Sequence, residues 1–229
     1  MITLYDKFID TQPPIPQIID DQEKVIQEYL GSGYERRMLC FESSWQDDLY
    51  KKLSVRPFME NLDQLTGQPI TVGYKYFESG EQLKFHLQWP DGLLWQNPVM
   101  WSNSMTVISC HGAPAGLQLP LGLVSQDELK DIFLDYGSDS SSVLYFSSCS
   151  LFQEKKFGWE LLEASKVRGL FGLTKDIGFT TGLLLDQILL STFYLYLDGD
   201  PFKHLVDIYE CVLESFPPAK EAGFTLFIP

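Results

Sequence analysis

Two short apolar runs of the chain each end in a side chain that can do acid–base or nucleophilic chemistry. The run 105–110 leads into His111, and the run 143–148 leads into Cys149. An imidazole beside a thiol is the smallest pair that can form a thiolate nucleophile with an acid–base partner. The two residues are far apart in the sequence, so this chemistry requires a fold that brings the ends of both runs together.

The composition of the two runs predicts how they are placed. Both have the length and the β-branched or aromatic content of buried parallel strands. Between them, residues 125–128 form a capping box of Ser, Gln, Asp and Glu that opens a helical pattern. The strand–helix–strand order predicts a right-handed βαβ unit, in which both strands end at the same edge of the sheet. Open α/β sheets bind ligands at that edge, so we expect His111 and Cys149 to share one crevice.

Further apolar runs of strand length extend the sheet. They are residues 37–41, 70–77, 170–174 and 224–228. Helical patterns, including one at 159–167 and a long apolar one at 179–197, separate most of them. We expect a short hairpin at 116–119 and a loop at 151–158. The sequence therefore predicts an α/β fold with a six-stranded, mostly parallel sheet and helices on both faces. We expect residues 35–229 to form this domain and the proline-containing segment 1–34 to form an N-terminal extension.

The charge balance bears on which partners the protein binds. The chain of 229 residues has a net charge of −14, and its basic residues do not cluster. Nucleic-acid binding and attachment to an anionic membrane both require basic patches, so we expect neither. With 45% hydrophobic residues, the chain can bury a large core.

The cysteines and the first residues bear on the cellular compartment. The four cysteines have no close-spaced framework and no CxxC pair, which is typical of reduced intracellular thiols. The first residues lack a basic region followed by a long apolar stretch, and the apolar run 183–197 is too short to span a bilayer. We therefore expect a cytoplasmic protein.

No sequence motif indicates a cofactor or a metal. Glycine-rich phosphate loops, GxGxxG and the GxSxG elbow of serine hydrolases are absent. A zinc site built from Cys110, His111 and Cys149 is disfavoured, because adjacent residues of a strand point to opposite faces. We expect a protein that works with neither.

The order of these motifs resembles a known family. An apolar strand ending in His-Gly, followed by one ending in Ser-Cys, is similar to the caspase-like (clan CD, CHAT-type) cysteine peptidases, which include caspases, metacaspases, separases and gingipains. The resemblance covers residues 35–229, and the layout is similar to small bacterial members of unsettled function. It implies a caspase-like three-layer sandwich. It also implies a cysteine endopeptidase acting on a protein or peptide substrate, in regulation or bacterial defence.

The resemblance also implies roles for single residues. His111 and Cys149 would be the catalytic dyad, and the amides of Gly112 and Cys149 would form the oxyanion hole. Two features depart from the family pattern. Residues 113–115 delay the second glycine that often follows His-Gly, and Ser147 stands where some branches have an aspartate that binds a basic substrate residue.

Five further residues lie where the family binds its substrate. Glu42, Asp47 and Asp48 follow the first strand, and Lys175 and Asp176 follow the fifth. A bound basic side chain would follow if one of the acids lined the pocket. The alternative is that the acids begin a solvated helix and that the last two are turn residues.

Two other functions remain open. The chain could keep the fold and act as a catalytically silent protein-interaction module, or it could be a flavodoxin-like binding domain in which Cys149 is an ordinary buried residue. Reactivity of the thiol distinguishes these from a peptidase.

The last strand raises the question of assembly. Residues 224–228 have high β propensity and no internal charge. If this strand lies at the sheet edge, its free backbone groups need a partner. Pairing with a second copy, as in the resembling caspases, would give a homodimer through the C-terminal strand. Alternatively, the extension 1–34 folds back over the edge.

Overall fold

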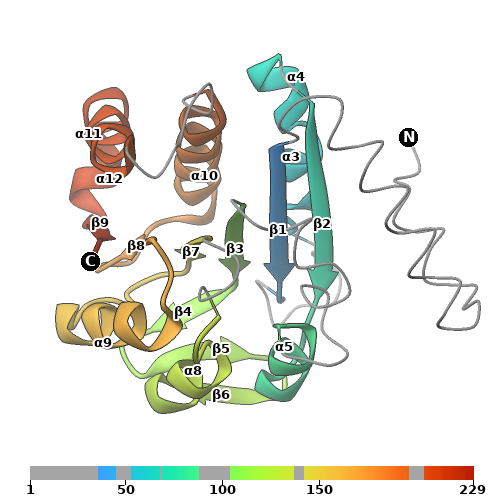
Figure 1. The fold of residues 1–229 in the computed structure, drawn as a ribbon, viewed down its shortest axis with the longest axis vertical. Helices are drawn as coiled ribbons and strands as arrows, with labels where there is room; N and C mark the ends of the chain where they lie inside the picture. Colours follow the sequence, from blue (N-terminus) through green and yellow to red (C-terminus); the bar gives the residue numbers. More distant parts are fainter. Residues whose placement is uncertain (1–35, 45–52, 68, 88–103, 137–141, 196–203) are drawn as a thin grey trace, which may run out of the picture. The chain divides into compact units, whose positions relative to one another are not determined.

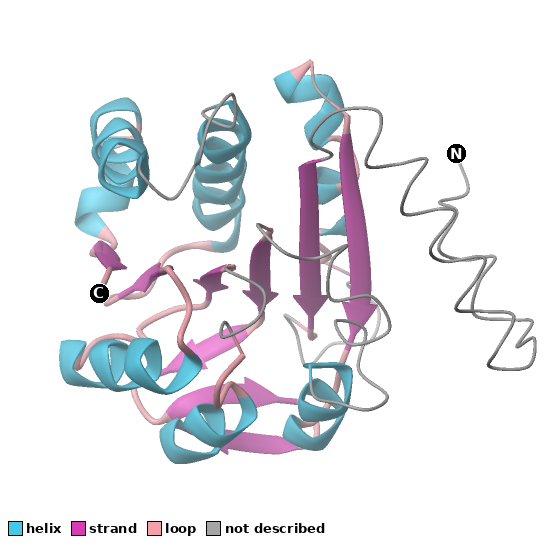
Figure 2. Cartoon of the chain, viewed as in Figure 1, coloured by secondary structure: helices cyan, strands magenta, loops and turns pink. Residues whose placement is uncertain are grey.

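The structure is a computed structural model, shown in Figures 1 and 2. It describes residues 36–44, 53–67, 69–87, 104–136, 142–195 and 204–229. All of these belong to one unit, Arg36–Pro229. The predicted extension 1–34, and the candidate residues Asp47 and Asp48, lie outside the described residues.

The unit contains a six-stranded sheet with the strand order β2-β1-β3-β7-β8-β9. The strands are β1 (Arg36–Glu42), β2 (Ile70–Tyr76), β3 (Met105–Ser109), β7 (Val143–Ser147), β8 (Gly169–Leu173) and β9 (Phe224–Phe227). Neighbours from β2 to β8 are parallel, and β9 is antiparallel to β8. The prediction of an α/β fold with a six-stranded, mostly parallel sheet is confirmed.

The two strands that precede the candidate site pair with each other in the middle of the sheet. Their register runs from Met105 opposite Val143 to Ser109 opposite Ser147. All residues of β3 and of β7 are buried, as expected for central parallel strands covered on both faces. The predicted adjacency of these strands is confirmed, and both end at the same sheet edge.

Helices cover both faces of the sheet (Figure 2). One face carries α3 (Arg56–Met59), α4 (Leu62–Thr66), α10 (Phe179–Leu195), α11 (Leu205–Ser215) and α12 (Pro217–Glu221), and the other carries α5 (Gly80–Leu87), α8 (Gln126–Ile132) and α9 (Lys155–Ser165). Side chains of β1 point alternately to the two helix layers. Met38 and Cys40 join the core beneath α10, whereas Phe41 stacks on His86 of α5.

A small antiparallel sheet follows β3 directly. It consists of β4 (His111–Ala113), β5 (Gly116–Leu119) and β6 (Gly122–Ser125), in that order. The sequence predicts only a short hairpin here, so the structure adds a strand that begins at His111. The predicted capping box is confirmed. The Glu128 amide donates to Ser125 Oγ (3.3 Å), and the Ser125 amide donates to the Glu128 carboxylate (2.7 Å).

Two helical segments differ from the sequence prediction. Helix α9 begins at Lys155, within the segment 151–158 that we predict as a loop, so that prediction is wrong. Helix α12 is not predicted at all. Its sequence starts with two prolines, which ordinarily indicate the end of a helix. Here they occupy the first turn, where the backbone N–H that proline lacks would have no helical partner.

Gly158 has low helix propensity but lies within α9, and its packing explains why. A Cβ atom at this position would lie 2.2 Å from the ring of Phe227 in β9. That ring is buried and packs against Phe152 and Trp159, so it has little room to move. The glycine therefore lets α9 pack closely on the edge strand.

We predict opposite effects for two helical glycine substitutions. Gly158→Ala is expected to lower the free energy of unfolding by about 1–3 kcal/mol, because the added methyl group overpacks the contact with Phe227. Gly182→Ala is the matched control, since each glycine is the fourth residue of its helix and a Cβ at 182 meets nothing closer than 3.6 Å. It is expected to raise stability by up to about 1 kcal/mol. Urea unfolding measures both, and a shift of the same sign in the two variants would contradict the argument.

Candidate active site

The main chain of Gly112 lies directly against Cys149. A Cβ atom on Gly112 would be 2.3 Å from the Cys149 carbonyl oxygen, 3.0 Å from the Cys149 nitrogen and 2.9 Å from Ser148 Cβ. Only glycine permits such an approach without displacing backbone. The predicted His-Gly and Ser-Cys motifs are therefore brought side by side.

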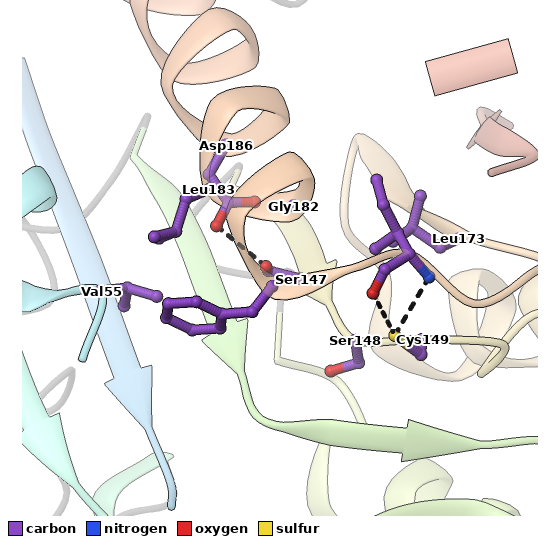
Figure 3. A pocket seen from close by; sticks show the side chains of 10 residues that line it. Val55, Ser147, Ser148, Cys149, Leu173, Gly182, Leu183 and Asp186 are labelled. Carbon is purple, nitrogen blue, oxygen red and sulfur yellow. Dashed lines mark hydrogen bonds between the residues drawn. The ribbon is translucent and has the colours of Figure 1, made fainter. Parts of the chain in front are cut away.

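The sulfur of Cys149 makes hydrogen bonds to the main chain of Ile177. Sγ donates to the Ile177 carbonyl oxygen (3.4 Å) and accepts from the Ile177 amide (3.5 Å), as the dashed lines in Figure 3 show. Burial raises the pKa of the half-buried Cys149 thiol, the Ile177 amide lowers it, and the charge of Asp176 raises it further. The net shift is upward, so the thiol is neutral in this form.

The segment 174–178 forms the loop that covers the thiol. The Ser150 amide donates to the Lys175 carbonyl (3.2 Å), the Ser150 hydroxyl donates to Asp176 Oδ1 (2.5 Å), and the Lys175 amide donates to the Ala222 carbonyl (3.1 Å). The two predicted substrate-binding residues of this loop are both exposed. The structure thus places Lys175 and Asp176 on the loop whose Ile177 contacts the Cys149 sulfur.

Ser150 has an unusual backbone conformation for its residue type. Its φ of 51° lies in the left-handed region, which costs a non-glycine residue about 1 kcal/mol or more. Its two hydrogen bonds to the loop hold it there. The turn directly after Cys149 is therefore strained and fixed, as the backbone around reactive groups often is.

His111 and the neighbouring Cys110 lie in different environments. Cys110 is fully buried with Sγ 3.6 Å from Ser148 Oγ, and burial raises its thiol pKa to about 12. His111 is exposed on β4. The hydrogen bonds of the Cys149 sulfur described above go to the main chain of Ile177. Within the described ranges, no three His, Cys, Asp or Glu side chains form a metal-binding group.

Glu42 is held by protein donors on both oxygens. It is buried at the end of β1 and accepts hydrogen bonds from Ser54 Oγ (2.7 Å), the Val55 amide (2.7 Å) and the Tyr74 hydroxyl (2.5 Å). These bonds join β1 to β2 and to the segment that opens α3. Glu42 is not among the residues that line the pocket beside Cys149.

A small pocket of about 20 Å³ adjoins Cys149 and contains an acid that is not among the predicted site residues. Asp186 of α10 lines this pocket together with Cys149 and Ser147 (Figure 3). Its carboxylate accepts hydrogen bonds from the Tyr145 hydroxyl (2.5 Å) and the Ser147 hydroxyl (3.0 Å). The available signal was a single acid inside the apolar helical run 183–197.

The side chain of Asp186 is 2% exposed. Burial raises its pKa to about 6, against the opposing effect of the hydrogen bonds from Tyr145 and Ser147. Among the described residues, no basic side chain forms an ion pair with it. Within the described part of the chain, the pocket thus contains a buried acid without a countercharge.

Comparisons with known proteins do not assign a family. No family model matches the chain, and no curated protein matches its sequence. Among the helices of the described segments, none has the length and apolar character needed to cross a bilayer.

The buried carboxylate should make stability depend on pH. The pKa of Asp186 rises from 3.8 to about 6 on folding, so the folded state retains the proton longer than the unfolded state. The wild type should therefore lose roughly 3 kcal/mol from this group as pH rises from about 3 to about 7, across both pKa values. Asp186→Asn removes this pH-dependent loss of stability, because an amide of nearly the same shape does not titrate. The difference in unfolding free energy between variant and wild type should grow by about that amount over the interval, as measured by urea unfolding. A difference that stays constant with pH would show that Asp186 keeps its ordinary pKa.

Proposed function

We propose that this protein is a caspase-like cysteine endopeptidase in which His111 and Cys149 form the catalytic dyad. The observation that supports it best is the contact of Gly112 with the Cys149 main chain. That contact supports the proposal because Gly112 directly follows His111 and Cys149 carries a half-buried thiol. Both lie at a sheet edge of the kind where α/β folds bind ligands. The substrate is a protein or peptide, and the role is regulatory or defensive.

The reaction uses groups at this edge. His111 takes the proton of the Cys149 thiol, and the thiolate attacks the carbonyl carbon of the scissile peptide bond. The amides of Gly112 and Cys149 donate to the oxyanion of the tetrahedral intermediate. Collapse of the intermediate breaks the C–N bond, and His111 returns the proton to the leaving amine. A water molecule, deprotonated by His111, then hydrolyses the thioester and releases the acid.

The Ile177 contact defines the form in which the protein rests. The amide and the carbonyl of Ile177 both hydrogen-bond to the Cys149 sulfur. The loop must therefore withdraw before His111 can take the thiol proton. A closed form of this kind is compatible with a peptidase that its substrate or a partner opens.

A catalytically silent interaction module is the second candidate. The specific observation in its favour is the same engaged thiol, whose pKa is raised and not lowered. Reactive cysteines are ordinarily recognised by a lowered pKa. A module would keep the closed loop permanently and present the fold to a partner protein.

Labelling by peptidyl acyloxymethyl ketones tests the dyad. The wild type should be labelled at Cys149 by at least one member of a panel with varied side chains. Cys149→Ala and His111→Ala should each abolish labelling, because one removes the nucleophile and the other its base. Cys110→Ala is the matched control, since this thiol is fully buried and should be inert. Labelling of Cys149→Ala equal to that of the wild type would exclude the assignment.

The sheet edge supports a proposal about assembly. β9 is the outermost strand beside β8. The Tyr209 hydroxyl donates a hydrogen bond to the carbonyl oxygen of Phe224, the first residue of β9 (3.2 Å). We propose that the outer backbone groups of β9 pair with the same strand of a second copy.

Light scattering tests that pairing. The wild type at micromolar concentration should have about twice the 26.2 kDa of one chain. Ile228→Lys should shift the mass toward a single chain, because a charge beside β9 opposes edge pairing. Circular dichroism of the variant controls for loss of folding. A wild-type mass near 26.2 kDa excludes the dimer.

A further inference from the structure

The contact between Cys149 and Ile177 brings a sulfur atom against a main-chain nitrogen. The two atoms are 3.5 Å apart, as one dashed line in Figure 3 shows. The residues on either side of the contact are also joined, because the hydroxyl of Ser150 donates to Oδ1 of Asp176 (2.5 Å). A loop fixed in this way holds the sulfur and the nitrogen in place for a reaction between them.

The Cys149 thiol is accessible to a small oxidant. It is half-buried, and the pocket beside it has a volume of about 20 Å³, which is the space of about one water molecule. Hydrogen peroxide is of similar size. A thiol that reacts with a peroxide becomes a sulfenic acid, which then condenses with a second thiol or with a main-chain nitrogen. The neighbours of the sulfur decide between these two outcomes.

No second thiol is placed to react with that sulfenic acid. All four cysteines lie within the described residues. Cys40 is in β1, which β3 separates from β7, a spacing of roughly 10 Å that no disulfide spans. Cys110 is fully buried beside Ser148, and burial raises its pKa to about 12, so almost none of it is the attacking thiolate. Cys211 is in α11, which contributes no described residue to the pocket beside Cys149.

We propose that Cys149 and the Ile177 amide form a redox switch, in which a peroxide converts the thiol to a sulfenamide bonded to the Ile177 nitrogen. In the first step the O–O bond breaks, the sulfur gains a hydroxyl group and loses two electrons, and the peroxide is reduced to water or an alcohol. In the second step the nitrogen bonds to the sulfur and the S–O bond breaks. The hydroxyl group then leaves with the amide proton as water.

Thiols reverse the switch. A small thiol attacks the sulfur, the S–N bond breaks and the nitrogen regains a proton, which leaves a mixed disulfide on Cys149. A second thiol then frees Cys149 and departs as a disulfide with the first. While the S–N bond lasts, the sulfur is protected from oxidation to the irreversible sulfinic acid. The switch goes beyond the proposed function, because it needs only the thiol and the loop and would operate in a peptidase or in an interaction module.

The pH dependence of the oxidation follows from the thiol. The pKa of Cys149 is raised by burial, and the thiolate is the form that reacts with a peroxide. The reaction should therefore be slow at neutral pH and should become faster as the pH rises.

Mass spectrometry of a variant with a single cysteine tests the switch. Cys40→Ala, Cys110→Ala and Cys211→Ala are combined, so that no disulfide within the chain is possible. Hydrogen peroxide should lower the mass of this variant by two hydrogen atoms, and dithiothreitol should restore it. Fragment spectra should link residues 149 and 177. If circular dichroism shows that the combined variant is unfolded, peptide mapping of the oxidised wild type distinguishes this link from a link between two cysteines.

Two loop variants serve as a matched pair. Ile177→Val keeps the main-chain nitrogen and should form the sulfenamide like the wild type. Asp176→Asn replaces the charged acceptor of the Ser150 hydroxyl by a neutral one. It should lower the ratio of sulfenamide to dimedone-trapped sulfenic acid by about tenfold, the difference between a hydrogen bond to a charged group and one to a neutral group.

Three results would overturn the proposal. The first is oxidation of Cys149 that stops at a sulfenic acid and is trapped completely by dimedone. The second is oxidation that proceeds directly to the sulfinic acid. The third is a loss of two hydrogen atoms that maps to a disulfide between Cys149 and another cysteine.

Discussion

The in-register pairing of β3 with β7 is the constraint on which the candidate site depends. Because Ser109 lies opposite Ser147, the residues that follow the two strands emerge together at one sheet edge. Gly112 then approaches the Cys149 main chain so closely that no side chain would fit. A shift of one residue in this register would turn the side chains of one strand to the other face and separate the motifs. The burial of both strands on both faces fixes the register.

Much of the fold could be predicted from the sequence because strand length, apolar content and crossover handedness leave few arrangements. The capping box before α8 is a local signal that tertiary packing does not override. The start of α9 and the whole of α12 were missed for a common reason. Gly158 and the prolines of α12 ordinarily interrupt helices, and only the packing against Phe227 or the position in the first turn makes them acceptable.

The sequence located the two ends of the site but not what lies between them. His111 and Cys149 end strand-like runs, so topology alone brings their main chains together. Asp186 sits on a helix, and its direction depends on how α10 packs over Tyr145 and Ser147, which no local pattern encodes. Glu42 illustrates the reverse case. Its position at the end of a predicted strand made it a candidate substrate-binding residue. In the structure its carboxylate accepts three hydrogen bonds from groups of the protein itself.

One residue of the loop, Ile177, contacts both the Cys149 thiol and the pocket. Its main chain hydrogen-bonds to the sulfur, and the residue also lines the pocket that contains Asp186. Because one residue contacts both, any displacement of this loop changes the surroundings of the sulfur and the wall of the pocket together. Asp186 has no basic partner among the described residues, and its burial in the charged form lowers stability, a cost that proteins retain mainly at functional sites.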